Sequence, residues 1–112
     1  MSILNLQIDQ GANFSREIEV LGNDGVTPRD LAGATVTSHL RKNYTSTAYT
    51  AINATPQTPF SAGKIVMSLT HTDTALLKHG RYVYDLEILQ SDTIDRIIEG
   101  VITIKPEVTK VV

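Results

Sequence analysis

The side chains that could do acid–base or metal chemistry are few and scattered. Three histidines are present, His39, His71 and His79, and cysteine is absent. No two histidines stand two or four residues apart, the spacing at which neighbouring imidazoles share a zinc ion, so no metal site is predicted. Asp85 and Glu87 share one face of a predicted strand, but paired carboxylates need a pocket for proton transfer, and the sequence indicates none. We therefore predict no catalytic residue, no metal and no cofactor.

Other motifs that carry chemistry are also missing. The chain has neither a G-x-S-x-G nucleophile motif nor a glycine-rich phosphate loop. The segment Gly22-Asn23-Asp24-Gly25 offers oxygen donors, but it lacks the aspartate spacing and the distal glutamate of a calcium loop. It is predicted to be a plain turn. An enzyme acting on a small-molecule substrate is therefore not expected.

The best candidate for a binding surface is the stretch of residues 41–49. Arginine and tyrosine are favoured at protein interfaces because they bury a large area at a low cost in side-chain entropy. A polar loop between two strands, with no binding role, is the alternative. The half-apolar tail, residues 108–112, is a second candidate, because a free strand can extend a neighbour's sheet. The candidate interface residues are Arg41, Lys42, Tyr44, Tyr49, Val108 and Val111.

Length and charge limit the possible partners. A chain of 112 residues fits a single domain covering residues 1–112. The formal net charge is -2 and no basic stripe is visible, so a nucleic-acid partner is not expected. No apolar run is long enough to cross a membrane, and no signal peptide is recognised at the start. Synthesis in the cytoplasm is therefore expected.

The elements that must position these side chains are strands. Apolar residues recur with a period of two, whereas a long period of 3.6 is absent. The predicted strands cover residues 4–8, 14–20, 34–41, 48–52, 64–69, 81–89 and 94–104. About seven short strands at this spacing predict an all-β, immunoglobulin-like antiparallel β-sandwich.

Three local features refine this prediction. A capping box at Thr70–Asp73 predicts one short helix near residues 72–78. Arg16 interrupts the apolar face of its strand, which indicates a sheet edge or a bulge. Residues 53–62 contain two prolines and are predicted to form a loop.

The segment Gly80-Arg81-Tyr82-Val83-Tyr84 matches the layout of an immunoglobulin-type tyrosine corner. In such a corner, the hydroxyl of a tyrosine near the start of a strand donates to the backbone a few residues upstream. Tyr82 takes that place, and Tyr84 stands where antibody domains have a cysteine. The alternative is that both tyrosines are ordinary core aromatics.

Six segments carry a resemblance to a phage family, more by their order and spacing than by any single motif. These segments are Leu6–Phe14, Asp30–Val36, Leu40–Thr47, Gly63–Thr70, Gly80–Glu87 and Arg96–Ile104. Together the set resembles small virion proteins of tailed phages, especially T4-like phages of cyanobacteria and marine bacteria. It is also similar to the N-terminal domain of the baseplate upper protein family of siphophages. In that family, the domain continues into a region that holds receptor-binding proteins. Here we expect the docking module alone.

The resemblance implies a structural protein of the virion that binds other phage structural proteins in multiple copies. A docking or adaptor role in the tail or baseplate is expected, and decoration or cementing of the capsid (head) is the alternative. A carbohydrate- or cell-surface-binding module is an alternative of another class, with Tyr44 and Tyr49 as its stacking platform. No nucleic acid, membrane or small-molecule substrate is expected as a partner.

Overall fold

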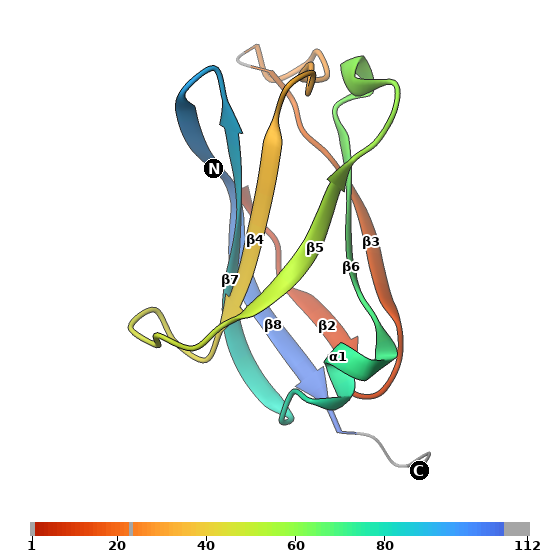
Figure 1. Ribbon diagram of the computed structural model, residues 1–112, viewed down its shortest axis with the longest axis vertical. Helices are drawn as coiled ribbons and strands as arrows, with labels where there is room; N and C mark the ends of the chain where they lie inside the picture. Colours follow the sequence, from red (N-terminus) through yellow and green to blue (C-terminus); the bar gives the residue numbers. More distant parts are fainter. Residues whose placement is uncertain (1, 23, 107–112) are drawn as a thin grey trace.

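The computed structural model describes residues 2–22 and 24–106, and strands make up most of it (Figure 1). In chain order, the elements are β1 (Ser2–Ile3), β2 (Leu6–Asp9), β3 (Phe14–Glu19), β4 (Thr35–Arg41), β5 (Thr50–Pro56), the 3-10 turn η1 (Phe60–Ala62), β6 (Lys64–Leu69), α1 (His71–Ala75), β7 (Gly80–Gln90) and β8 (Thr93–Lys105).

The strands form two layers that share one strand. In the first layer β1 and β2 pair with β8, which is followed by β7 and β4; the second layer contains β6 and β3. The strand β5 joins the layers, because residues 50–52 pair with β4 and residues 53–56 pair with β6. Figure 1 shows β5 running obliquely from one layer to the other. The predicted all-β sandwich is confirmed, and the order β8–β7–β4 beside β6–β3 is that of the immunoglobulin fold.

The start of the chain departs from the predicted antiparallel pairing. Both β1 and β2 run parallel to β8, and the single strand predicted over residues 4–8 is interrupted at Leu4 and Asn5. At the interruption, the side-chain oxygen of Asn5 accepts the backbone N–H of Val101 at 3.0 Å, in place of a backbone carbonyl. A Cβ on Gly100 would collide with the Leu4 carbonyl oxygen, so glycine permits this close approach.

The core lies between the two layers and is filled by alternate residues of the strands. On β7 and β8, the predicted inward faces are confirmed. The buried apolar side chains of the whole core are Leu6, Ile8, Ile18, Val20, Leu31, Leu40, Ile52, Ile65, Met67, Leu69, Leu77, Tyr84, Leu86, Ile88, Ile98, Ile102 and Ile104. Because inward residues alternate with outward ones, Thr37 and His39 of β4 and Asp85 and Glu87 of β7 must lie on the outer face of the first layer, whereas Ser38 is buried on the inner face.

Two predictions about strand edges had different outcomes. Among the described residues, strand β3, which carries Arg16, pairs with β6 alone, so the prediction of a sheet edge is confirmed. The predicted loop over residues 53–62 is wrong for its first part, since β5 continues to Pro56. That proline is the last residue of the strand, a position where the missing N–H is tolerated.

The predicted N-cap at Thr70 is present, but the helix is shorter than expected. The Thr70 hydroxyl oxygen accepts the Asp73 N–H at 3.3 Å, and α1 ends at Ala75 rather than near residue 78. The next turn tightens as the N–H of Leu77 bonds to the Thr74 carbonyl, and the Leu77 side chain enters the core. Burial of that leucine therefore accounts for the early end of α1.

Thr74 links α1 to the turn between β2 and β3. Its hydroxyl oxygen accepts the Gly11 N–H at 3.1 Å and donates to the Ala12 carbonyl at 2.8 Å, and the residue is fully buried. A buried side chain that satisfies two backbone groups of a distant turn holds the two segments in one position.

The two tyrosines of β7 each donate a hydroxyl hydrogen bond to a backbone carbonyl outside the strand. The Tyr82 hydroxyl donates to the Lys78 carbonyl at 2.8 Å, so the predicted tyrosine corner is confirmed. The Tyr84 hydroxyl donates to the Leu4 carbonyl, which lies above Gly100. Tyr84 thereby fastens the start of the chain to the core.

Candidate functional site

The candidate site lies on the outer face of the first layer, where β4, β7 and β8 are neighbours. His39 on β4 stands directly opposite Asp85 on β7, and Thr37 stands opposite Glu87. The register also places Glu87 opposite Arg96 on β8, after a bulge between Leu86 and Glu87. Strand alternation therefore brings a histidine, two carboxylates and a guanidinium onto one surface.

The loop between β4 and β5 forms one wall of the site. Its turn is held by Asn43, whose side-chain oxygen accepts hydrogen bonds from the Thr45 N–H and from the Ser46 hydroxyl. The guanidinium of Arg41 donates to the Ser46 carbonyl at 2.7 Å and to the Thr47 carbonyl at 3.2 Å. These bonds hold residues 42–49 in a defined loop that projects from the sandwich (Figure 1).

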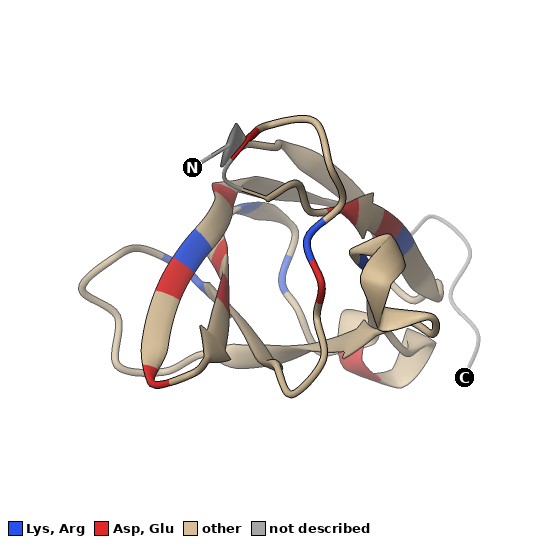
Figure 2. Ribbon diagram, turned by 90° about the horizontal axis from the view of Figure 1, so that it is seen from above, with Lys and Arg blue, Asp and Glu red and all other residues tan. Residues whose placement is uncertain are grey.

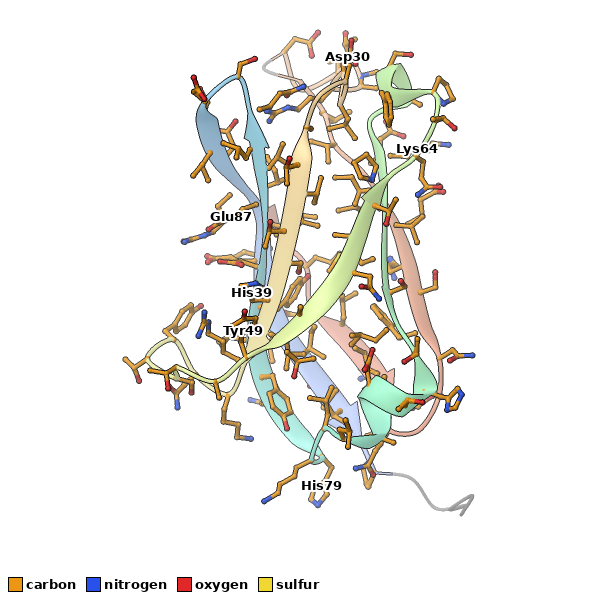
Figure 3. The ribbon with its side chains drawn as sticks, viewed as in Figure 1. Asp30, His39, Tyr49, Lys64, His79 and Glu87 are labelled. Carbon is orange, nitrogen blue, oxygen red and sulfur yellow. The ribbon has the colours of Figure 1, made fainter. Side chains whose placement is uncertain are left out.

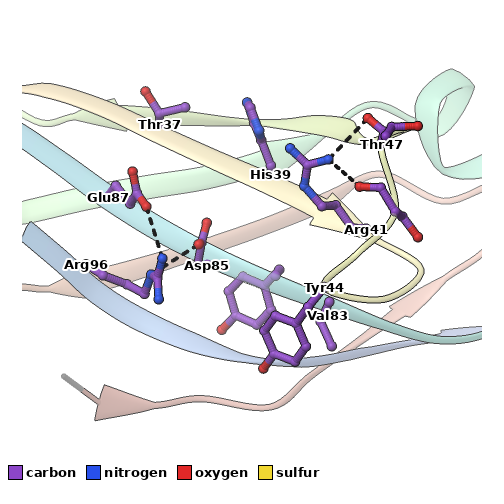
Figure 4. A pocket seen from close by; sticks show the side chains of 11 residues that line it. Thr37, His39, Arg41, Tyr44, Thr47, Val83, Asp85, Glu87 and Arg96 are labelled. Atoms are coloured by element: carbon purple, nitrogen blue, oxygen red, sulfur yellow. Dashed lines mark hydrogen bonds and ion pairs between the residues drawn. The ribbon is translucent and has the colours of Figure 1, made fainter.

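A groove of about 570 Å³ lies between this loop and the strands (Figure 4). This volume falls within the range of small-ligand pockets. Asp85 and Glu87 line the groove, although the sequence pattern indicated no pocket. The side chains that line the groove include Thr37, His39, Arg41, Tyr44, Thr47, Val83, Asp85, Glu87 and Arg96. We call it the outer groove.

Opposite charges balance one another in the outer groove. The guanidinium of Arg96 lies 3.3 Å from an Asp85 carboxylate oxygen and 3.5 Å from a Glu87 oxygen. Burial raises the pKa of Asp85 above its ordinary value, and the charge of Glu87 adds to that rise; interactions with Arg96, His39 and Arg41 oppose it. Because the charges in the groove balance, a polar group of a partner can form hydrogen bonds there without carrying a net charge itself.

The aromatic residues of the loop have different roles. The Tyr49 ring stacks on the His39 imidazole, with centroids 4.0 Å apart, and the Arg41 guanidinium lies 5.0 Å from the ring centre. The ring of Tyr44 lines the groove and is 76% exposed. Tyr44 is thus open to a partner, whereas Tyr49 braces the loop against β4 (Figure 3).

Not all predicted interface residues meet at this groove. Arg41 and Tyr44 line it, and Tyr49 stacks on His39, which also lines it. The Lys42 ammonium instead lies over the Tyr82 ring, 4.9 Å from its centre, and donates to the Arg81 carbonyl. The remaining two, Val108 and Val111, lie outside the described residues.

Sequence reasoning missed the carboxylates and Arg96 as members of a site. Their only signal was an outward-facing pair, Asp85 and Glu87, in a strand otherwise rich in apolar residues. Solvated strand faces carry the same pattern, so the groove can be recognised only once the position of the loop between β4 and β5 is known.

The structure also places the candidate calcium-loop segment and the two remaining histidines. The carboxylate oxygen of Asp24 accepts the N–H groups of Val26 and Thr27 at 3.0 and 2.9 Å, as in a plain turn; its neighbour Asn23 lies outside the described residues. These bonds lower the pKa of Asp24 to about 2, and the Thr27 side chain contributes most to that shift. His71 and His79 are exposed.

Within residues 2–22 and 24–106, no group of three or more histidine, aspartate or glutamate side chains could hold a metal ion. In the same part of the chain, none of the helices has the length and apolar character that a membrane crossing requires.

Comparison with known proteins gives the fold and no family. No protein-family model matches the chain, and no curated protein matches its sequence significantly. Among solved structures, the chain is similar to the crystal structure of InlP from Listeria monocytogenes, with a TM-score of 0.51 and 13% sequence identity. The match covers 93% of this chain but only 26% of InlP. At this identity the likeness concerns the β-rich fold alone.

Proposed function

We propose that the chain is a structural protein of a tailed-phage particle, in which it docks onto other virion proteins of the tail or baseplate. The support comes from the ordered set of phage-like segments and from an immunoglobulin-like sandwich that carries a projecting loop. Under this proposal, the protein is made in the host cytoplasm and ends in the virion, and it acts without catalysing a reaction.

The observation that carries the proposal is the exposed Tyr44 ring at the edge of the outer groove. Tyrosine at the rim of a groove is typical of contact residues, because the ring buries much area and has few rotamers to lose. The groove also holds polar groups, with Arg96 between two carboxylates, so a partner loop can find hydrogen bonds beside an aromatic contact.

Many copies would compensate for the small size of such a contact. Virion contacts repeat by symmetry, and each copy needs only a modest area when several contacts form together. Decoration of the head would use the same kind of contact. The position of the chain in the particle separates this alternative from the tail or baseplate.

One observation favours the carbohydrate-binding alternative. An exposed tyrosine beside Asp85, Glu87 and Arg96 resembles the combination of a stacking ring and planar polar groups that holds a sugar. Tyr49 weakens this alternative, since its ring is already engaged by His39 and Arg41. Of the two tyrosines expected from the sequence, Tyr44 is the more exposed, at 76% against 54% for Tyr49, and is the better candidate to stack on a sugar.

The proposal is tested by incorporation into the particles of the phage that encodes the chain. Quantitative mass spectrometry of purified particles is expected to find the wild type in multiple copies. We expect Tyr44→Ala and Arg96→Glu each to weaken the contact about tenfold, a loss of about 1.4 kcal/mol, and thereby to reduce the copy number. Ile3→Ala is the control, because Ile3 is similarly exposed but belongs to β1.

Two results would count against docking through the groove. Absence of the wild-type chain from purified particles would contradict the virion proposal itself. Normal copy numbers for both groove variants would contradict the assigned surface. Binding of the isolated protein to a glycan array, abolished in Tyr44→Ala, would favour the carbohydrate alternative.

A further inference from the structure

The two ends of the sandwich carry opposite charges. The acidic end contains the loop before β4 and the turn between β7 and β8, and its aspartates are Asp24, Asp30, Asp92 and Asp95. Figure 3 places Asp30 at one end of the molecule and His79 at the other, and Figure 2 looks onto the acidic end. Hydrogen bonds from Gln90 to the Asp30 carbonyl and from Arg29 to Asp95 hold this end together.

Cations at the acidic end do not cancel its charge. Arg29 is committed to Asp95, with nitrogen and oxygen 3.2 Å apart. Glu19 and Lys64 are cross-strand neighbours at the same end and add one charge of each sign. The acidic end therefore keeps an excess of negative charge over the described residues.

The opposite end, which we call the basic end, gathers cations from three segments. Its cations are Lys42 after β4, Lys78 and Arg81 around the start of β7, and Lys105 at the end of β8. The carboxylates described at this end are Asp9 and Asp73, so the cations are in excess. The two ends are separated along the longest dimension of the molecule, 45 Å.

Exposed apolar side chains accompany the charges. Many of the large apolar residues that are exposed lie at the acidic end: Leu21, Val26, Phe60, Leu89 and Ile94. The pair Leu89 and Ile94 are direct cross-strand partners in the β7–β8 hairpin. At the basic end Leu76, just after α1, is 80% exposed. Clustered apolar residues with a charged rim are typical of an interaction surface.

We propose that copies of this chain associate head to tail, with the acidic end of one copy against the basic end of the next. Charge complementarity favours this contact, whereas pairing two like ends would bring equal charges together. The contact is heterologous, so it builds rings or linear stacks rather than closed pairs. The cross-section of 30 by 21 Å limits the contact to about 500 Å² per copy, the size of a weak interface.

Sedimentation velocity on the purified chain tests this proposal. The wild type is expected to associate with rising concentration, up to about 1 mM, in about 20 mM salt, and to be monomeric in about 500 mM salt, where the charges are screened. Reversal of one end, in Asp30→Lys/Asp92→Lys or in Lys78→Glu/Arg81→Glu, is expected to weaken self-association about tenfold or more.

Mixing the two double variants gives the sharpest result. Each variant has two ends of one sign and is expected to be monomeric alone, but a mixture presents one native acidic end and one native basic end. We expect the mixture to associate again. Arg16→Glu, a reversal of an exposed charge in the middle of β3, is the control and is expected to associate like the wild type.

The thermal unfolding of every variant is measured in parallel, so that loss of folding is separated from loss of contact. A wild type that stays monomeric at low salt and high concentration would overturn the proposal. So would two end-reversed variants that associate like the wild type, or a mixture of them that remains monomeric.

Discussion

Replacing Tyr84 by phenylalanine removes one hydroxyl from the point where the start of the chain meets the core. The hydroxyl donates to the Leu4 carbonyl, and the tyrosine side chain is only 4% exposed. Loss of this bond leaves a partly buried carbonyl without its partner, which costs about 1–1.5 kcal/mol. For a domain of this size, we expect the melting temperature to fall by about 4–6 °C at neutral pH.

The same substitution has a pH signature. Burial raises the pKa of Tyr84 to about 12, against the opposing charge of Arg16, whereas an unfolded tyrosine ionises near 10. Between these values the unfolded chain loses a proton that the folded chain keeps, so stability falls as pH rises. Tyr84 thus contributes stability that is complete below pH 10 and is lost on passing through about 12.

Urea unfolding of the wild type and of Tyr84→Phe, from pH 7 to about 11.5, measures both effects. The alkaline loss specific to the wild type amounts to about 1–2 kcal/mol, after allowance for partial access of solvent to the hydroxyl. The advantage of the wild type is therefore expected to shrink above pH 10 and to vanish near pH 11.5. A difference that stays constant over the whole range, or no difference at pH 7, would refute the assignment.

Three further predictions concern single contacts. Thr74→Val keeps the shape of the side chain but leaves two backbone groups of the β2–β3 turn without partners. Urea unfolding is expected to show that the free energy of unfolding falls by about 2–3 kcal/mol. Thr74→Ser keeps the hydroxyl and should retain most of the wild-type stability. Gly100→Ala forces the Leu4 carbonyl away from β8; hydrogen exchange in residues 3–5 is expected to accelerate, and unchanged exchange would contradict this reading. Carbon NMR of Asp24 is expected to give a midpoint near pH 2, with the Thr27 amide shifting at the same midpoint; because the folded pKa is lowered, the stability that this turn contributes is lost as pH falls toward 2. A midpoint near 4 would show that the turn does not form.

Most of the fold could be predicted because the alternation of apolar residues is strong where a strand has one buried face. The inward residues of β7 and β8, such as Leu86 and Ile102, follow directly from that pattern. The tyrosine corner was also accessible, since its glycine and tyrosine stand at fixed spacing. What escaped was the pairing of β1 and β2, because parallel contact with β8 depends on the end of the chain nearly 100 residues away.

The candidate site was only partly accessible from sequence for the same reason. Arg41 and Tyr44 are conspicuous by residue type, and both line the groove. Asp85, Glu87 and Arg96 carry no local signal, because their role depends on register between strands and on the loop that folds beside them. The charge difference between the two ends likewise arises only when loops distant in sequence are brought together.

The most direct measurement for the proposed docking role is the position of this chain in a density map of the purified phage particle. The account predicts repeated copies in the tail or baseplate, with Tyr44 and the outer groove covered by a neighbouring virion protein. A particle that lacks the chain, or copies whose groove faces open solvent while another surface makes the contact, would contradict it.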